Sequence, residues 1–198
     1  MPELETILDK MRALATGPSD ALASLAERIS KSPGDPTLLE EAGRLLANQL
    51  EFRSGGMAAR RALLLHPARP WAALVLSHFL LRNQRLDHAA RHARQAHVID
   101  ASSEEIFRHL AEILHDLDHL DTLDRLARER LDHTADDPTA HFWLARTSTR
   151  GADPAAQSLH LRHAAKGGAD LARQARYVGL TLTTTEARAL LDGPTKGT

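Results

Sequence analysis

The 198-residue sequence contains no cysteine, which excludes disulfide bonds, thiolate metal sites and a cysteine nucleophile. Aromatic residues make up only 4% of the chain, whereas alanine, leucine and arginine recur throughout and favour helices over strands. No stretch approaches the roughly 20 apolar residues that a membrane-spanning helix needs. The composition therefore predicts an all-α fold without a membrane span.

An excess of charge of one sign is also lacking. The 25 basic and 26 acidic side chains give a formal net charge of −1, so the chain as a whole has no electrostatic attraction for nucleic acid or anionic lipid. The first residues include acidic side chains and no apolar segment of a signal peptide. We expect a cytoplasmic protein with neither nucleic acid nor membrane as a partner, and the predominance of arginine over lysine indicates a bacterial source.

Motifs for catalysis are missing as well. The sequence has no phosphate-binding loop, nucleophile elbow, metalloprotease histidine pair or glycine-rich dinucleotide motif. Two histidine pairs have helical i, i+4 spacing, His88 with His92 and His115 with His119, but a zinc site needs at least three protein ligands and no third is fixed nearby. We predict no enzymatic activity, no cofactor and no metal site, and interpret these histidines as solvated.

A period of 34 residues organises what is present. The repeat starts are Pro2, Pro36, Pro70, Glu104 and Pro138. Proline is tolerated best in the first turn of a helix, so each start predicts the beginning of a helix. Three of the residues just before these starts, Asp35, Ser103 and Asp137, can cap a helix N-terminus, whereas Arg69 is the exception.

Each repeat contains the pattern of two helices. The eighth position is small, as a close crossing of two helices requires, and it is occupied by Gly43, Ser77, Ala111 and Ala145. Leucines nearby form an apolar stripe at helical spacing. We predict turns between the two helices at Gly17-Pro18, Ser54-Gly55-Gly56, Asn83-Gln84 and Gly151 to Pro154.

This pattern resembles the tetratricopeptide repeat family, whose unit is a 34-residue antiparallel helix pair. The third repeat is close to the family pattern through Leu76, Ser77, Leu80, Ala89 and Ala96, and the first and last repeats depart from it most. The resemblance implies a single domain, a right-handed superhelical stack of helix pairs. Its repeats are residues 2–35, 36–69, 70–103, 104–137 and 138–171, followed by a capping segment at 172–192 and a tail at 193–198.

In the family, one face of each first helix lines a concave groove that binds peptides. The positions opposite the packed stripe would line that groove, because each residue turns the helix by about 100°. The candidate partner-binding residues are Arg44, Asn48, Trp71, Leu74, His78, Arg82, Arg108 and Arg146. Arginine and tryptophan together suit a protein or peptide partner with an acidic group or C-terminal carboxylate.

Alternatives remain open at this point. Trp71 can instead be an ordinary core aromatic, and the arginines can be structural ion-pair partners of neighbouring repeats. The lysine and asparagine clamp with which some family members hold chaperone tails is not reproduced, since Glu41 stands where asparagine is expected. Besides an adaptor, the resemblance is compatible with a self-assembling homo-oligomeric scaffold, a secretion-type chaperone or an accessory subunit that recruits a partner enzyme.

Overall fold

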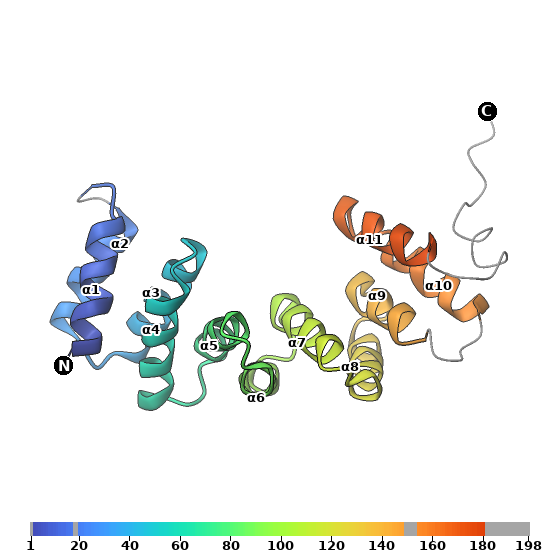
Figure 1. Cartoon of the computed structure of the whole chain (residues 1–198), viewed down its shortest axis with the longest axis horizontal. Coiled ribbons are helices and arrows are strands. Elements are labelled where there is room, and N and C mark those ends of the chain that lie inside the picture. Colours follow the sequence, from blue (N-terminus) through green and yellow to red (C-terminus); the bar gives the residue numbers. More distant parts are fainter. Residues whose placement is uncertain (1, 18–19, 149–153, 181–198) are drawn as a thin grey trace. The chain divides into compact units, whose positions relative to one another are not determined.

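The structure, a computed structural model, describes residues 2–17, 20–148 and 154–180 (Figure 1). Every regular element in these ranges is helical, as the sequence predicts. The helices are α1 (Pro2–Leu14), α2 (Ala21–Lys31), α3 (Pro36–Asn48), α4 (Phe52–Leu65), α5 (Pro70–Arg82), α6 (Leu86–Ile99), α7 (Glu104–Asp116), α8 (Leu120–His133), α9 (Pro138–Thr147), α10 (Pro154–Ala164) and α11 (Ala169–Leu180). The expectations for Pro18, residues 151–153, the end of the capping segment and the tail fall outside the described residues.

The first helix of each repeat begins at the residue that the period predicts. Asp35 and Asp137 each accept a hydrogen bond from the amide two residues later, at 2.8 and 2.9 Å. Ser103 Oγ accepts one from the amide three residues later, at 3.4 Å. These bonds satisfy backbone donors that the first turn of a helix leaves free, so the three predicted caps are confirmed.

The start of α5 is stabilised differently, because Arg69 supplies no cap. Glu40 of α3 accepts a hydrogen bond from the amide of Ala72 at 3.0 Å and pairs with the Arg69 guanidinium at 3.3 Å. Both side chains are mostly buried, with 13% of Glu40 and 24% of Arg69 exposed. One repeat therefore caps the next through a carboxylate, which also fixes the register of α5 on α3.

Contacts divide the chain into two compact units, residues 1–113 and 114–198. In the first unit α3 packs on α4, α4 on α5 and α5 on α6, so consecutive helices lie side by side (Figure 1). In the second unit α8 packs on α9, α9 on α10, and α10 on α11. Within each unit a helix thus contacts mainly its neighbours in the chain, as in other repeat stacks.

The connections inside the second, third and fourth repeats share one backbone conformation. Each has three residues, and the middle residues, Leu50, Gln84 and Asp118, have positive φ angles of 62°, 58° and 57°. The residue after each donates its amide to the carbonyl five residues earlier, at 2.9–3.0 Å. This is the Schellman arrangement that ends many helices, usually with glycine at the left-handed position. The predicted turn at Asn83-Gln84 is confirmed.

The turn predicted at Ser54-Gly55-Gly56 is wrong. These residues are buried inside α4, and the connection is instead residues 49–51. A Cβ atom on Gly55 would lie 2.9 Å from the carbonyl oxygen of Gly43 and 3.3 Å from the backbone nitrogen of Ala47. Glycine is therefore present because the backbones of α3 and α4 approach closely there, and not because the chain turns.

The same crossing recurs in the third and fifth repeats. Ser77 Oγ donates a hydrogen bond to the carbonyl of Ala89 at 2.8 Å. The side-chain amide of Gln157, 6% exposed, donates to the carbonyl of Ala145 at 2.8 Å. Gln157, a polar residue of the fifth repeat, thus bonds a backbone carbonyl at the helix crossing, which confirms the eighth position as a site of close approach.

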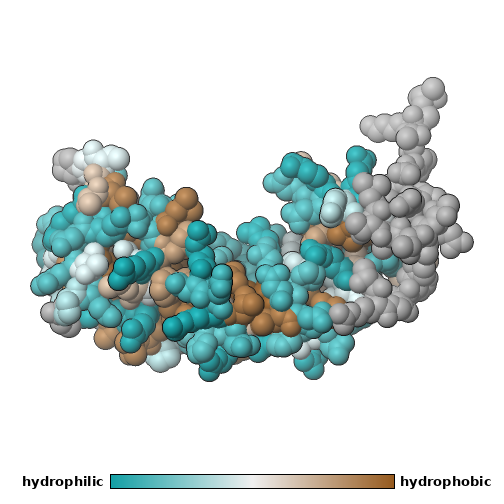
Figure 2. Space-filling view, viewed as in Figure 1, coloured by the Kyte–Doolittle hydropathy of each residue, from teal (hydrophilic) through white to brown (hydrophobic). Residues whose placement is uncertain are grey.

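The face of the molecule seen in Figure 2 is largely polar. Figure 2 shows apolar patches among mostly hydrophilic side chains on the face in view. Among the described residues, the large apolar side chains that remain exposed are Leu50, Leu64, Leu65, Val98, Ile99, Leu159 and Tyr177. Among the described helices, none combines the length and apolar character needed to cross a bilayer.

Replacing Leu50 by glycine is expected to stabilise the chain. The leucine side chain is 75% exposed and contributes little packing, while a left-handed backbone costs a non-glycine residue roughly 1–2 kcal/mol. Because glycine also loses more freedom on folding, we expect the free energy of unfolding to rise by about 1 kcal/mol or less. Urea denaturation followed by circular dichroism measures this change.

The matched control is Leu64→Gly, which is equally exposed but lies in the last turn of α4. It should lose up to about 1 kcal/mol, because glycine is less favourable than leucine at a helical position. A loss of stability in Leu50→Gly would contradict the assignment of strain to this turn.

Adding one methyl group to Gly55 is expected to force α3 and α4 apart. The nearest atom is backbone and cannot rotate away, so Gly55→Ala should lower the free energy of unfolding by about 1–3 kcal/mol despite the better helix propensity of alanine. In Gly34→Ala the new methyl group would have no atom within 4 Å. The same urea experiment should show little change there, and an equal loss in both variants would argue against the crossing.

Candidate functional site

Seven of the eight predicted groove residues lie in the first unit, on its first helices. Arg44 and Asn48 lie on α3, and Arg108 lies on α7. The other four are on α5, namely Trp71, Leu74, His78 and Arg82. Arg146 belongs to α9 of the second unit. The seven residues of the first unit are therefore described together, and Arg146 is described separately.

Arg44 and Trp71 form the clearest pair on this surface. The guanidinium carbon of Arg44 lies 4.8 Å from the centre of the indole ring, within the range of a cation–π interaction. The Arg44 side chain is exposed, while Trp71 is partly buried. The indole ring thus holds a solvent-accessible cation in place.

The assignment of Leu74 to an open groove is wrong. Its side chain is 2% exposed and belongs to a buried cluster with Ala73, Ala96 and Ile106. Trp71 packs against the same cluster, so it acts in part as the inter-repeat aromatic that was the alternative interpretation. Neighbouring helices α6 and α7 cover this side of α5, and helical register alone could not reveal that.

His78 is occupied by contacts with α7. Its ring centre lies 3.7 Å from that of His109, which is 3% exposed. The Ser77 hydroxyl gives its single proton to a backbone carbonyl, so His109 Nε2, 2.9 Å away, donates to Ser77 Oγ. Burial, together with the nearby His78 and Arg108, lowers the pKa of His109 to about 3. Burial and then Arg108 also lower the pKa of His78.

Arg82, at the end of α5, pairs with an aromatic ring that the sequence did not single out. Its guanidinium carbon lies 4.3 Å from the ring centre of Phe52. Phe79, Arg53 and Asn83 complete a shallow hollow around this pair. No sequence signal marked Phe52, because it begins α4 and meets Arg82 only when the two helices pack.

The residues that remain accessible form what we call the arginine surface, defined as Arg44, Asn48, Arg82 and Arg108. All four side chains are exposed. Within the described part of the chain, none of its three arginines forms an ion pair with a carboxylate. Guanidinium groups bind carboxylates and phosphates through two parallel hydrogen bonds, so this surface can receive acidic groups.

Arg146 is engaged within the second unit. It bonds Nε2 of His115 at 2.9 Å and lies 5.4 Å from the ring centre of Trp143 and 5.7 Å from that of Phe142. Burial lowers the pKa of Arg146, and the charge of Asp116 opposes this effect. Its contacts are those of a packed side chain.

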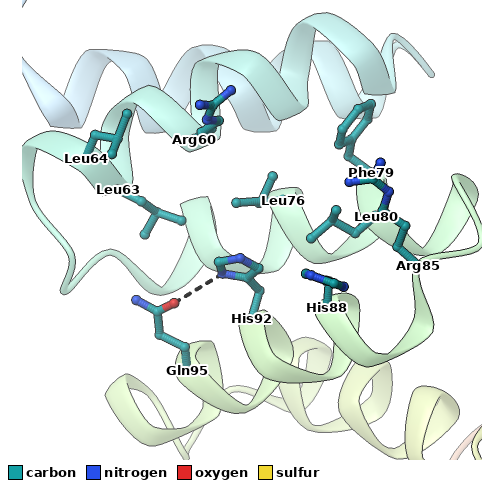
Figure 3. Close-up of a pocket in the computed structure, with 10 residues that line it drawn as sticks. All are labelled: Arg60, Leu63, Leu64, Leu76, Phe79, Leu80, Arg85, His88, His92 and Gln95. Atoms are coloured by element: carbon teal, nitrogen blue, oxygen red, sulfur yellow. Dashed lines mark hydrogen bonds between the residues drawn. The ribbon is translucent and has the colours of Figure 1, made fainter.

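A separate pocket of about 510 Å³ lies between α4, α5 and α6 (Figure 3). Apolar side chains from α4 and α5 form much of it, and cationic or titratable side chains lie around them. The lining residues are Arg60, Leu63, Leu64, Leu76, Phe79, Leu80, Arg85, His88, His92 and Gln95. We call this the α4–α6 pocket; the sequence did not predict it because three helices contribute to it.

The four histidines with i, i+4 spacing, which were interpreted as solvated, differ in exposure. His88 and His119 are exposed, whereas His92 and His115 are partly buried. His92 bonds Gln95 at 3.2 Å, and His115 bonds Arg146. In the described ranges, one group of three residues has metal-ligand geometry, Asp136 with His141 and His163. His160 and His163 have i, i+3 spacing, which also places residues on one helix face and was the signal that could have marked them.

Comparison with protein-family models finds no match, and neither does comparison with curated proteins. Solved structures do match. One of them is YrrB, described as a tetratricopeptide repeat protein with an unusual peptide-binding site. The two sequences are 14% identical, the match covers 85% of this chain and 89% of YrrB, and the TM-score is 0.66. PilF of Pseudomonas aeruginosa is 12% identical over 96% of this chain and 97% of its own, with a TM-score of 0.64.

A structure of MamA from Desulfovibrio magneticus RS-1 is 17% identical over 89% of this chain and 97% of its own, with a TM-score of 0.60. At such identities the likeness concerns the fold alone. The chain has the tetratricopeptide repeat fold, an all-α solenoid of helix pairs, and the resemblance drawn from its 34-residue period is confirmed at that level.

The buried His109 is expected to make the chain less stable in acid. The unfolded chain takes up a proton near the ordinary pKa of 6.5, whereas folded His109 does so only near 3. Stability therefore falls as the pH is lowered through this window, by about 1.4 kcal/mol per pH unit. The wild-type chain loses free energy of unfolding between about pH 6.5 and 4.5, and in His109→Gln this loss should be smaller by about 2 kcal/mol.

Urea unfolding at the two pH values measures this difference. The control is His133→Gln, since His133 is exposed at the end of α8. The control should keep the acid sensitivity of the wild-type chain. If His109→Gln kept it too, His109 would not be the group responsible.

Proposed function

We propose that this chain is a non-catalytic interaction module that binds an acidic segment of another protein across the arginine surface. The observation that carries the proposal is the exposed Arg44 guanidinium, stacked on Trp71 and without a carboxylate partner among the described residues. A stacked arginine loses less side-chain freedom on binding than a free one, so more of its interaction energy appears as affinity.

The neighbouring arginines favour an extended ligand and not a single bound ion. Arg82 at the end of α5 is held on Phe52, and Arg108 lies on the next first helix, α7. Stacks of helix pairs offer extended surfaces on which segments of other proteins bind. The peptide-binding site named for the structurally similar YrrB supports the same kind of activity. We expect the ligand to place two or more carboxylates along these helices.

The α4–α6 pocket is a second candidate position for the same function. Its apolar lining, with Leu64 75% exposed at one side and Arg85 exposed at another, suits an apolar anchor next to an acidic group. The arginine surface offers charge with little apolar area, since Leu74 is buried. A ligand that depends mainly on an apolar side chain would therefore favour the pocket.

Selection of peptides from a random display library against the full chain tests both positions. We expect enriched peptides to be acidic, and expect Arg44→Glu/Arg108→Glu to weaken a selected peptide by about tenfold or more, since 1.4 kcal/mol corresponds to a factor of ten. Fluorescence anisotropy with a labelled peptide measures the affinity. Circular dichroism checks that each variant remains helical.

Two matched variants separate the outcomes. Leu64→Glu/Arg85→Glu alters the pocket, and Arg91→Glu/Arg94→Glu makes the same charge change as the test variant on exposed positions of α6. Loss of binding in the pocket variant alone would move the site to the pocket. Equal loss in all three would indicate unspecific attraction, and failure to enrich any peptide would shift the weight to a self-assembling scaffold, which light scattering of the purified chain would detect.

A further inference from the structure

Three histidines converge in the second unit, away from the surfaces described above. His141 lies on α9, and His160 and His163 lie on one face of α10. The ring centre of His141 is 4.4 Å from that of His163 and 5.1 Å from that of His160. Asp136, just before α9, approaches the group with its Oδ1 atom 3.4 Å from His163 Nδ1. Two consecutive helices and a connection thus bring four potential ligands together.

The donor atoms are close enough to share one ion. Asp136, His141 and His163 each offer one ligand atom, and these atoms all lie within 4.8 Å of one another. Two ligands bound at about 2 Å can lie up to about 4 Å apart across a metal ion. The remaining gap is small, and the Asp136 side chain is 87% exposed and can turn to close it.

The histidines of this cluster are shielded from solvent, since His141 is buried and His160 and His163 are partly buried. His141 is only 7% exposed. Nδ1 of His163 is buried and makes no hydrogen bond. A buried nitrogen without a hydrogen bond is costly to a protein, and a metal ion held between His163 and Asp136 would satisfy it.

A second contact can orient His141. Its Nδ1 atom lies 2.8 Å from Nδ1 of His160, and its Nε2 atom lies 3.2 Å from the carbonyl oxygen of Ala135. Because a carbonyl oxygen only accepts, Nε2–H donates to Ala135 in this geometry, and Nδ1 accepts from His160. Binding of a metal at Nε2 would replace the bond to Ala135 and require the other tautomer, in which Nδ1–H donates to His160. Histidine ligands commonly donate their other ring N–H in this way, which fixes the tautomer and the ring orientation.

We propose that Asp136, His141 and His163 bind one divalent transition-metal cation of the zinc class, with His160 as the positioning residue for His141. Two imidazole nitrogens and one carboxylate oxygen suit Zn²⁺ and not Mg²⁺ or Ca²⁺, which prefer oxygen ligands. Asp137 is not available as a ligand, because it pairs with Arg130 at 2.8 Å and caps α9. The ion would tie the connection before α9 to α10 and so stabilise the last helix pair.

Titration of the metal-free full chain with Co²⁺ and Zn²⁺ tests the site. We expect one equivalent of Co²⁺ to give the visible absorption of a low-symmetry site, and Zn²⁺ to compete for it. Asp136→Asn and His163→Gln should each weaken Zn²⁺ binding by tenfold or more, measured against a chromophoric chelator. His160→Gln should weaken it by about tenfold and keep the stoichiometry, the effect typical of an outer-shell partner.

The controls are Asp132→Asn and His133→Gln, which make the same changes at exposed positions of α8. Both should bind Zn²⁺ like the wild type. Because Asp136 is exposed, Asp136→Asn should fold normally, which circular dichroism verifies, and its result is decisive. Unchanged affinity in Asp136→Asn and His163→Gln, or the absence of a saturable single equivalent, would overturn the proposal and assign any uptake to other histidines of the twelve in the chain.

Discussion

The close crossing of the two helices in each repeat is the constraint on which the rest of this structure depends. At Gly55 the backbones of α3 and α4 are so near that an added Cβ atom would lie 2.9 Å from the carbonyl oxygen of Gly43. In other repeats a small residue at the same position lets a polar side chain reach a backbone carbonyl, from Ser77 to Ala89 and from Gln157 to Ala145. Fixed crossings of this kind set where every outward-facing residue lies.

Burial behind these crossings determines which polar residues can act at the surface. Ser77 completes its bond to Ala89 and accepts another from His109, so His109 and its neighbour His78 are committed to holding α7 against α5. Arginines behave differently, because their stems can pack while the charged group stays in water. Arg44 and Arg82 accordingly lie on aromatic rings at the surface and remain available to a ligand.

Local chemistry made part of the fold predictable. Prolines and capping residues mark helix starts through interactions within a few residues, so the period could be read directly from the sequence. The failures involve residues whose role is set by another helix. Glycines such as Gly55 are typical of turns, but Gly55 lies where two helices cross. The connection at Leu50, where the chain does turn, contains no glycine. Leu74 has the register of a groove residue, yet Ala96 and Ile106 cover it.

The same reasoning explains why the candidate sites were predicted so unevenly. Exposed arginines on first helices follow from helical register, which the 34-residue period supplies. The cluster of His141, His160 and His163 depends instead on how α9 meets α10, and its spacing of three residues is as common on ordinary helix faces as on metal sites. A guanidinium group has no lone pair to offer and binds anions, whereas an imidazole nitrogen can coordinate a metal. The two sites therefore differ in chemistry, with acidic ligands suited to the arginines and a metal ion suited to the histidines.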